Sequence, residues 1–496
     1  MFEIKSNNVS LNKEEFLRTI EDMISKGIRI HDLDDMYMEV LDAVEKKKNE
    51  VSAKYDIDNP SSTKQLQEYL RDLRRAEVIG ACTFRGKFTT NAQALEKLSK
   101  LGYEIGDDML ELRELDSTRK AIKQLYENID SENIIRPNVA LGRTFRVKYS
   151  KPALLSVPKH MMWDLIAPRE DGQQIWSVDI KNQEPNIIAN IKNCQEIKER
   201  LGGELYEKMF DWCYGPKAKL TVVVFNCDSV QIIDNEAIAK MTTRDELYAP
   251  YRVNEQFKYD GRSVKAAYPR CVRCPIGKKL TLGDLPKTIK IYVDNLGFVE
   301  ADVEWELPNR GPENLGVFSL EGTIKDIYLE LKKEVRKEFK TSWNALTYGQ
   351  SKQGLIQMCK NIDGEVLWDK FNSIDGLKNW RLSCKNKARL GNGVTVTSYF
   401  GTVMEPDGWN QSEIARQIMD YEIQGTGADI LELLVNNFNN NKPDYMEIYY
   451  TRHDELIILV DDGVKTEEEI EADLRKLFEH KVDDWKPFEV EVRRVV

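Results

Sequence analysis

The stretch Met446–Val460 reads MEIYYTRHDELIILV and holds three polar residues between two β-forming runs. Isoleucine, tyrosine, leucine and valine dominate these runs, and such residues favour strands. A short polar connection between two such runs predicts a tight antiparallel hairpin with His453, Asp454 and Glu455 at its tip. Taken alone, the same residues are also typical of a solvated turn without a chemical role.

A second acidic residue follows a β-forming run in the stretch Ile175–Ile188, IWSVDIKNQEPNII. The run ends near Asp179, and Pro185 is favoured as a first helical residue, so we expect a helix to open there. Asp179 is then either a helix cap or a carboxylate directed out of a sheet edge. If Asp179 and Asp454 converge, they are suited to two Mg²⁺ ions about 3.5–4 Å apart, as phosphoryl transfer requires.

The stretch Asp326–Gly354, DIYLELKKEVRKEFKTSWNALTYGQSKQG, predicts a charged helix. Steps of four residues place four polar side chains on one slowly drifting stripe of that helix: Arg336, Lys340, Asn344 and Tyr348. Two cations on such a stripe are suited to a triphosphate, whose leaving pyrophosphate gains charge in the transition state. A lysine- and arginine-rich helix is otherwise a solvated surface. Together the three stretches indicate nucleotidyl transfer.

Four motifs in this chain resemble those of the DNA polymerase I family, also called family A DNA polymerases. SVDIKNQEPNII is similar to the family's first palm motif, usually written DYSQIELR, and RHDEL resembles its last palm motif. The spacing of arginine, lysine and Tyr-Gly in the charged helix resembles the fingers motif. ARQIMDYEIQGTGADIL is similar to the QGTAAD block, with Arg416 and Gln424 at the matching separation. The motifs occur in the family order.

The likeness covers nearly the whole chain apart from one insert. LGRTFRVKYSKPALLSVP is similar to the family's TGRLSS…PNLQNIP segment, and NPSSTKQLQEYL belongs to a thumb-like pattern in which Ser62 and Gln65 form a capping box. Because that pattern begins almost at Met1, the resemblance implies a core without an exonuclease domain. The implied regions are a thumb at 1–150, a palm at 151–195 and 376–496, and fingers at 196–375.

The insert separates the fingers-like helix GELYEKMFDWCYG from the charged helix. The runs LTVVVF, SVQII, TIKIYV and ADVEWEL alternate with turn residues and predict a β-rich insert at about 216–315. It is either a contact surface for the template, a displaced strand or a replication partner, or a passive elaboration. Its CVRC motif, Cys271 and Cys274, is at most half of a zinc site, with Cys213 and Cys227 as loose further candidates.

The resemblance implies catalytic roles for four residues. Asp179 and Asp454 would hold the metal ions, and Glu455 would assist beside them. Lys340 would bind the triphosphate and donate a proton to the pyrophosphate. The residues implied to contact the primer–template near the growing end are Arg143, Arg416, Gln424 and His453.

The remaining matched residues concern the nucleotide. Arg336 would bind the triphosphate, Tyr348 would close the pocket, and Glu184 would exclude a ribose 2′-hydroxyl. Asn344 replaces a family aromatic residue and follows Trp343, which puts selectivity at the sugar 3′ position in question. Further polar positions of the family are replaced by Ile180, Lys181 and Asn182 and by Ala153, Leu154, Leu155 and Ser156, so we expect modest fidelity.

Composition is compatible with this interpretation. The 496 residues allow about three domains, and the net charge of −11 argues against a uniformly basic DNA-coating protein. Attraction to phosphates must then come from local patches such as KKEVRKEFK and KNWRLSCKNKAR. The eight cysteines form no framework, and neither a signal pattern nor a membrane-spanning run is present. We expect a monomer in the cytoplasm of a bacterial or phage-infected cell.

The sequence therefore predicts an α+β right-hand polymerase fold, with an antiparallel-sheet palm, a helical thumb and helical fingers. The expected function is template-directed DNA synthesis from dNTPs on primer–template DNA, with two Mg²⁺ ions or Mn²⁺ in their place. A single-subunit RNA polymerase-like enzyme is the first alternative, against which Glu184, QGTGAD and HDEL argue. A catalytically idle nucleic-acid-binding factor is the second, against which the complete set of acids and cations argues.

Overall fold

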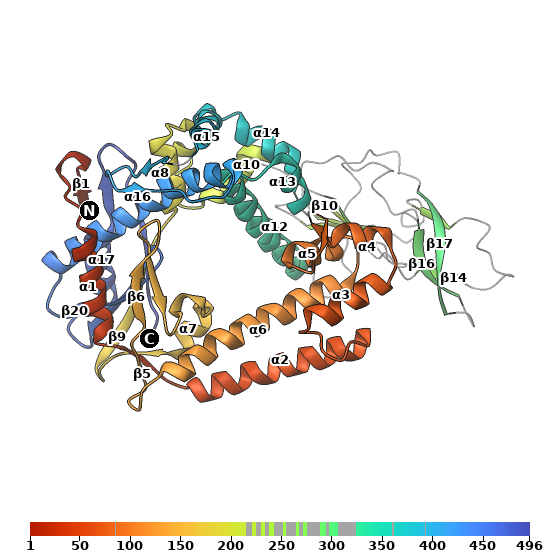
Figure 1. The fold of residues 1–496 in the computed structure, drawn as a ribbon, viewed down its shortest axis with the longest axis horizontal. Coiled ribbons are helices and arrows are strands. Elements are labelled where there is room, and N and C mark those ends of the chain that lie inside the picture. The colour runs from red at the N-terminus through yellow and green to blue at the C-terminus, as the bar shows by residue number, and fades with distance from the viewer. Residues whose placement is uncertain are drawn as a thin grey trace. The chain divides into compact units, whose positions relative to one another are not determined.

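The computed structural model divides the chain into two compact units. The first unit comprises Met1–Lys181 and Gln424–Val496, and the second comprises Asn182–Ile423. The mixture of helices and mainly antiparallel sheets confirms the predicted α+β class (Figure 1). The predicted thumb, palm and fingers bounds stay predictions. The structure describes residues 1–84, 86–214, 324–359, 362–391 and 393–496, and between 214 and 324 it describes only the strands β10 to β17.

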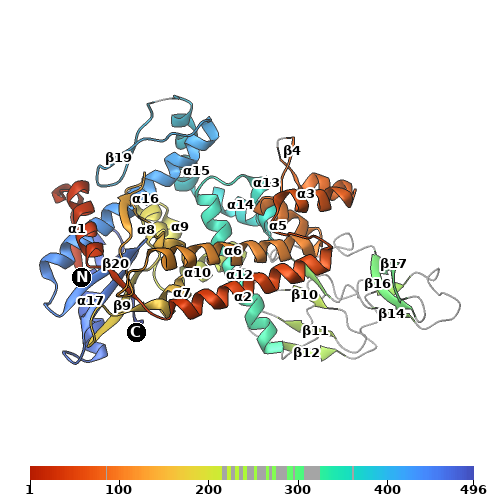
Figure 2. The ribbon, with the colours of Figure 1, turned by 60° about the horizontal axis from the view of Figure 1, so that its bottom comes forward.

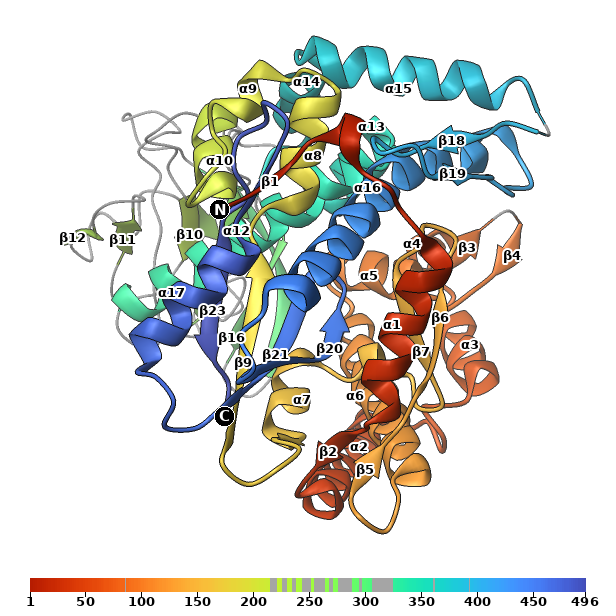
Figure 3. The ribbon, with the colours of Figure 1, turned by 90° about the vertical axis from the view of Figure 1, so that its left-hand side faces the viewer.

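A four-stranded antiparallel sheet in the order β20-β21-β9-β23 forms the centre of the first unit. The strands are β9 (Gln173–Ile180), β20 (Met446–Arg452), β21 (Glu455–Asp461) and β23 (Val490–Arg494). The first six residues of β21 are buried, as befits a central strand covered on both faces. Helix α17 (Glu467–Phe478) packs against β23, and Figure 3 shows it beside the sheet. The predicted hairpin is present as β20 and β21.

The first 150 residues of the first unit are mainly helical. Helices α2 and α6 run side by side in both views (Figures 1 and 2). Leucines from three helices, among them Leu66, Leu95 and Leu112, are almost fully buried in one core. The helices are α1 (Lys13–Ser25), α2 (Leu33–Tyr55), α3 (Thr63–Asp72), α4 (Ala76–Ala81), α5 (Ala92–Lys100) and α6 (Glu104–Asn128).

The expected capping box at the start of α3 is only half formed. The Ser62 side chain accepts the backbone N–H of Gln65, as predicted. The Gln65 side chain, however, accepts the N–H of Asn59 at 2.7 Å, where the capping box requires the N–H of Ser62. The preceding turn therefore takes the second capping bond.

Outside residues 215–323, the described part of the second unit is mainly helical, and aromatic side chains form much of its core. Phe339 and Trp343 of α12 are buried and pack together, and Trp343 meets Phe371 edge to face. No helix in the described part of the chain combines the length and apolar character needed to cross a membrane. The helices described in the second unit are α8 (Gln183–Ile191), α9 (Gln195–Lys198), α10 (Leu205–Tyr214), α12 (Ile324–Thr347), α13 (Lys352–Met358), α14 (Gly364–Asn372) and α15 (Asp375–Ala388), followed by α16 (Gln411–Asn441), which continues into the first unit.

Helix α8 begins two residues earlier than predicted. Asn182 takes a left-handed backbone conformation, with φ of 52°, so the chain turns into the helix directly after it. Pro185 then lies in the first turn, where its missing N–H has no helical acceptor and costs nothing. The prediction that the helix opens at Pro185 was therefore wrong by two residues.

The segment between α10 and α12 contains strands at all four predicted runs. Strands β16 and β17 pair antiparallel through six residue pairs. The side chains of Cys271 and Cys274, and the whole of Cys227, lie outside the described residues, so the zinc prediction stays a prediction. The strands are β10 (Thr221–Val224), β11 (Val230–Ile233), β12 (Ile238–Thr242), β13 (Tyr251–Val253), β14 (Val264–Ala266), β15 (Cys271–Cys274), β16 (Thr288–Val293) and β17 (Gly297–Trp305).

Candidate active site

The predicted acidic residues of the first unit meet at one end of the central sheet. Asp179 of β9 lies directly opposite Glu455 of β21 in the antiparallel register. Asp454 follows in the tight turn, and its backbone carbonyl accepts the N–H of Ile180 at 3.4 Å. Residues that are 275 positions apart in the chain, Asp179 and Asp454, thus lie beside each other because two strands pair in this register.

The connection between β20 and β21 is a two-residue turn. Arg452 pairs with Glu455, so only His453 and Asp454 lie between the strands. His453 has a positive φ of 57°, as the first position of a tight hairpin turn requires. The turn therefore fixes His453 and Asp454 at the end of the sheet by backbone geometry.

A lysine bridges two of the acidic side chains. The Nζ atom of Lys159, the first residue of α7 (Lys159–Leu165), is 3.2 Å from Asp179 Oδ2 and 2.8 Å from Glu455 Oε1. The Ser177 hydroxyl donates a hydrogen bond to the same Glu455 oxygen. The Glu455 side chain is only 3% exposed, whereas that of Asp179 is 40% exposed. Glu455 is thus the fixed member of the pair and Asp179 the accessible one.

Burial raises the pKa of the Asp179 carboxyl above its usual range. The positive charge of Lys159 opposes this rise, and the negative charge of Glu455 adds to it. Arg493 of β23 also lowers the pKa of Asp179. A nearby cation stabilises the ionised form of such a carboxylate, because its charge offsets both the desolvation and the repulsion between the two acids.

The donor set is suited to a hard divalent cation. Asp179 and Glu455 direct carboxylate oxygens at a single cationic atom, Lys159 Nζ. Mg²⁺ commonly takes one or two protein carboxylates and completes its shell with water and substrate phosphates. Within the described residues, no three histidine, cysteine, aspartate or glutamate side chains form a group that could hold a metal ion. A metal ion held by Asp179 and Glu455 would therefore complete its shell with water or with further oxygens, such as those of a bound nucleotide.

A second hairpin brings the predicted DNA contacts of the first unit together. Arg143 lies in the turn between β6 (Asn138–Leu141) and β7 (Val147–Ser150). The hydroxyl of the adjacent Thr144 donates to Gln424 Oε1 at 3.5 Å. The β7 strand is joined to β20 by a hydrogen bond of 3.0 Å between the Tyr149 and Thr451 hydroxyls. This turn, Gln424 and the central sheet therefore form one connected structure.

In the second unit, the predicted stripe of α12 faces helix α10. Arg336 pairs with Glu204, with Arg336 Nη2 3.1 Å from Glu204 Oε2. Lys340 Nζ lies 5.3 Å from the centre of the Tyr206 ring. The Tyr206 hydroxyl donates to Asn344 Oδ1 at 3.2 Å. Arg336, Lys340 and Asn344 thus contact residues at or just before the start of α10.

The fourth stripe residue, Tyr348, follows the end of α12 and contacts helix α8. Its hydroxyl donates a hydrogen bond to the carboxylate of Glu184. The next residue, Gly349, has a φ of 91°, and a Cβ there would lie 3.0 Å from Cγ of Arg416. The turn after α12 therefore packs closely on α16, and glycine is required by both conformation and space.

Lys159 and Tyr206 were not predicted from the sequence as residues of these sites. Lys159 stands in the segment after Pro158, where no motif pointed to an acid-binding role. Tyr206 is 7% exposed, and burial, followed by the charge of Glu184, raises its pKa to about 12. Its position in the quoted fingers-like helix was the available signal. Trp343 does not supply the aromatic ring missing at Asn344, because Trp343 is buried in the core.

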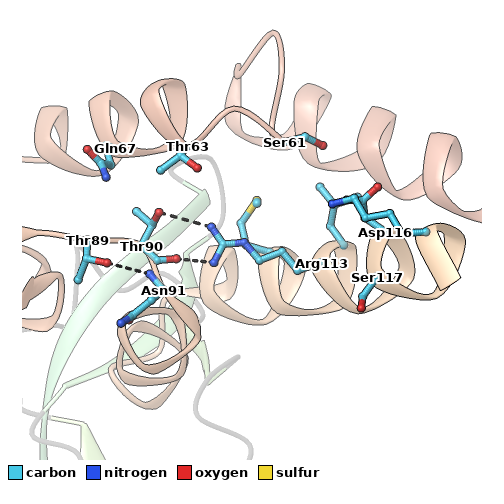
Figure 4. Close-up of a pocket in the computed structure, with 12 residues that line it drawn as sticks. Ser61, Thr63, Gln67, Thr89, Thr90, Asn91, Arg113, Asp116 and Ser117 are labelled. Carbon is cyan, nitrogen blue, oxygen red and sulfur yellow. Dashed lines mark hydrogen bonds and ion pairs between the residues drawn. The ribbon is translucent and has the colours of Figure 1, made fainter. Parts of the chain in front are cut away.

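A separate pocket of about 540 Å³ lies among the helices of the first unit. Figure 4 shows Arg113 of α6 directed at Thr90, whose backbone carbonyl and hydroxyl accept its hydrogen bonds. The pocket is lined mostly by polar residues of α3, α6 and the segment just before α5, together with Met109 and Leu112 of α6. None of the acidic residues of the central sheet lines it, so it is not the candidate active site.

Comparison with known proteins supports the fold. No protein-family model matches the chain, and no curated protein sequence matches it. Among solved structures, the chain is similar to the POL domain of Pol1 from M. smegmatis in complex with DNA primer-template and dNTP. The TM-score is 0.63 at 17% sequence identity, over 97% of this chain and 69% of the other. The protein therefore has the fold of a DNA polymerase domain.

Proposed function

We propose that this protein is a template-directed DNA polymerase that joins dNTPs to the 3′-hydroxyl of a primer. The observation that carries the proposal is the meeting of Asp179, Glu455 and the Asp454 turn at one sheet end. That arrangement occurs in a chain with the fold of a polymerase domain. Phosphoryl transfer depends mainly on positioning and on charge stabilisation, for which such a carboxylate set is suited.

The acids of the first unit have one task in this proposal. Asp179 and Asp454, with Glu455 beside them, would hold Mg²⁺ ions, which when bound activate the attacking oxygen and stabilise the leaving one. Glu455 is held by Ser177, so it provides a fixed reference for the more exposed Asp179. His453 and Arg143 lie in turns that would contact the primer–template. These contacts would recognise its shape and not its base sequence.

The cations of the second unit have another task. Arg336 and Lys340 would bind the triphosphate, and Lys340 would hold at Nζ the proton that passes to the leaving pyrophosphate. The side chain of Arg336 is half exposed, so its pair with Glu204 is weak and yields readily to a phosphate. Lys340 keeps its position through the ring of Tyr206.

The choice of deoxynucleotides rests on Glu184. Its carboxylate accepts the hydrogen bond of Tyr348, so both side chains are fixed. A fixed carboxylate disfavours a ribose 2′-hydroxyl by occupying its space and by leaving it without a partner. This contact favours DNA over RNA synthesis.

A primer-extension assay tests the proposal. The full chain is incubated with Mg²⁺ and a primed DNA or RNA template, with dNTPs or rNTPs in parallel. We expect template-directed extension with dNTPs that stops when EDTA is added. A preference for rNTPs would instead indicate an RNA polymerase, and binding without extension would indicate a nucleic-acid-binding factor. Comparison of extension on the DNA and RNA templates shows which of the two nucleic acids the protein copies.

A further inference from the structure

Lys159 occupies the position where the two carboxylates of the candidate active site converge. Its Nζ atom is within hydrogen-bond range of Glu455 Oε1 at 2.8 Å and near Asp179 Oδ2 at 3.2 Å. These oxygens come from adjacent strands, β9 and β21, whereas Lys159 comes from helix α7. A side chain from a third element thus supplies the positive charge between them.

The environment of Lys159 holds its ammonium in place. Nζ lies 4.8 Å from the centre of the Trp163 ring, and the guanidinium carbon of Arg493 lies 3.3 Å from the centre of the same ring. Arg493 is opposite Ser177 in the sheet register, and Ser177 donates to Glu455. Lys159 and Trp163 both belong to α7, so this helix and the Trp163 ring direct the lysine at the acids.

The charges explain why a cation is needed there. The Glu455 side chain is 3% exposed, and a buried carboxylate is costly unless it is paired. Asp179 lies directly opposite on the neighbouring strand, so two negative charges face each other. An ammonium offsets both effects without metal. A divalent ion bound to the same oxygens would also offset the desolvation and the repulsion. The ion and the Lys159 ammonium would then lie close together and repel each other.

We propose that Lys159 is a resident counter-ion of the Asp179–Glu455 pair, which a divalent ion must displace from Asp179 in order to bind. Lys159 is then a positioning residue that keeps the acids in place between catalytic cycles and sets the affinity of the site for metal. The inference rests on the proposed function, because that function assigns metal binding to Asp179, with Glu455 assisting beside it.

Binding of Mn²⁺ alone, measured by electron paramagnetic resonance on the full chain without DNA or nucleotide, tests the inference. Lys159→Met and Lys159→Gln remove the competing charge, and we expect each to bind Mn²⁺ about tenfold more tightly than the parent. Lys159→Arg keeps a charge and should bind no more tightly than the parent. An unchanged or weaker affinity in both neutral variants would overturn the inference.

Lys26→Met is the matched control. Lys26 pairs with Glu447 of β20, on the same sheet but away from the acids, and Arg169 remains beside Glu447 at 2.9 Å when Lys26 is lost. Its Mn²⁺ affinity should equal that of the parent. A gain as large as that of Lys159→Met would show a general charge effect and would also overturn the inference.

Thermal unfolding separates this role from a purely structural one. A resident counter-ion predicts that Lys159→Met lowers Tm in EDTA and that Mn²⁺ restores most of the loss. An ordinary structural ion pair predicts the same loss with and without Mn²⁺. This comparison also identifies a neutral variant that folds poorly without metal.

Asp179→Ala distinguishes the two levels of the argument. If Asp179→Ala binds Mn²⁺ as well as the parent, the metal assignment of the proposed function is wrong and the role of Lys159 is wrong with it. If Asp179→Ala loses Mn²⁺ while the neutral Lys159 variants gain nothing, the metal assignment stands and only the inference on Lys159 is refuted.

Discussion

The hydroxyl of Tyr348 donates a hydrogen bond to the carboxylate of Glu184. Tyr348 follows helix α12, and Glu184 lies in the first turn of α8, so the contact joins two distant parts of the second unit. From the resemblance of the motifs, Tyr348 is expected to close the nucleotide pocket and Glu184 is expected to exclude a 2′-hydroxyl. The hydrogen bond supports the proposal that the two side chains act together.

Glu184→Ala is expected to weaken sugar selectivity. Loss of the side chain opens space for a 2′-hydroxyl, so the ratio of kcat/KM for dNTP over rNTP should fall by about 10–100-fold. Single-nucleotide incorporation measures this ratio. Glu199→Ala, at the exposed end of α9, is the control and should leave it unchanged. An unchanged ratio in Glu184→Ala would remove the residue from sugar discrimination.

Gly349→Ala is expected to disturb the turn after α12. A Cβ at this position would lie 2.9 Å from Met419 Cε and 3.0 Å from Arg416 Cγ, on a backbone with φ of 91°. Strain of about 1–3 kcal/mol should follow, together with a raised KM for dNTP. Gly401→Ala is the control for backbone strain alone, because φ there is 96° and nothing lies within 4 Å. Equal effects of the two variants would show that the packing on α16 is unimportant.

Lys13→Met is expected to destabilise the first unit without touching the active site. Lys13 Nζ lies 2.7 Å from Glu432 Oε2 and also contacts Asp429, and both acid side chains are fully buried. Loss of the ammonium leaves buried carboxylates without their cation, at a cost of about 3–5 kcal/mol. Urea unfolding measures the change.

The control for this change is Lys5→Met. The pair of Lys5 with Glu3 is exposed on both sides and should contribute about 0–1 kcal/mol. If Lys13→Met unfolds at the same urea concentration as Lys5→Met, the buried pair does not hold α1 in place.

His480 is expected to make stability fall in mild acid. Its ring is fully buried on Phe488, and burial lowers its pKa to about 4 from the usual 6.5. Because the unfolded chain takes up this proton at a higher pH than the folded chain, stability is lost as the pH falls from about 6.5 to about 4. The loss should reach about 3 kcal/mol.

Comparison with His480→Gln isolates this effect, because glutamine does not titrate. The difference in unfolding free energy between the parent and His480→Gln should shrink by about that amount between neutral pH and about pH 4. A difference that stays constant with pH would show that His480 titrates normally in the folded protein.

Local patterns predicted much of the fold, including several elements that carry the candidate site. The hairpin around Asp454 and the helix that carries Lys340 were both predictable from the sequence, because the hydrophobic periods of strands and helices involve residues close together in the chain. The start of α8 was predicted less accurately. The preference for Pro185 near a helix start does not specify the left-handed turn at Asn182. Boundary errors of this kind reflect turn geometry.

Contacts between distant segments were not predictable from one sequence. Lys159 meets Asp179 and Glu455 only after three elements pack together, and Tyr206 meets Asn344 across two helices. The basic patch on α15 shows the same limit. Arg381 in that patch is 6% exposed and donates to the carbonyl of Gln350, so it is unavailable to phosphates.

The acidic end of the central sheet is the part of the protein on which the proposed function depends. Single-turnover primer extension by Asp454→Ala, with primer–template binding measured on the same sample, tests it most directly. We predict that extension is lost, by at least about 10³-fold, while binding to primer–template DNA stays near that of the parent, because the cationic contacts remain. Extension at near the parent rate would contradict the assignment of this carboxylate to the reaction.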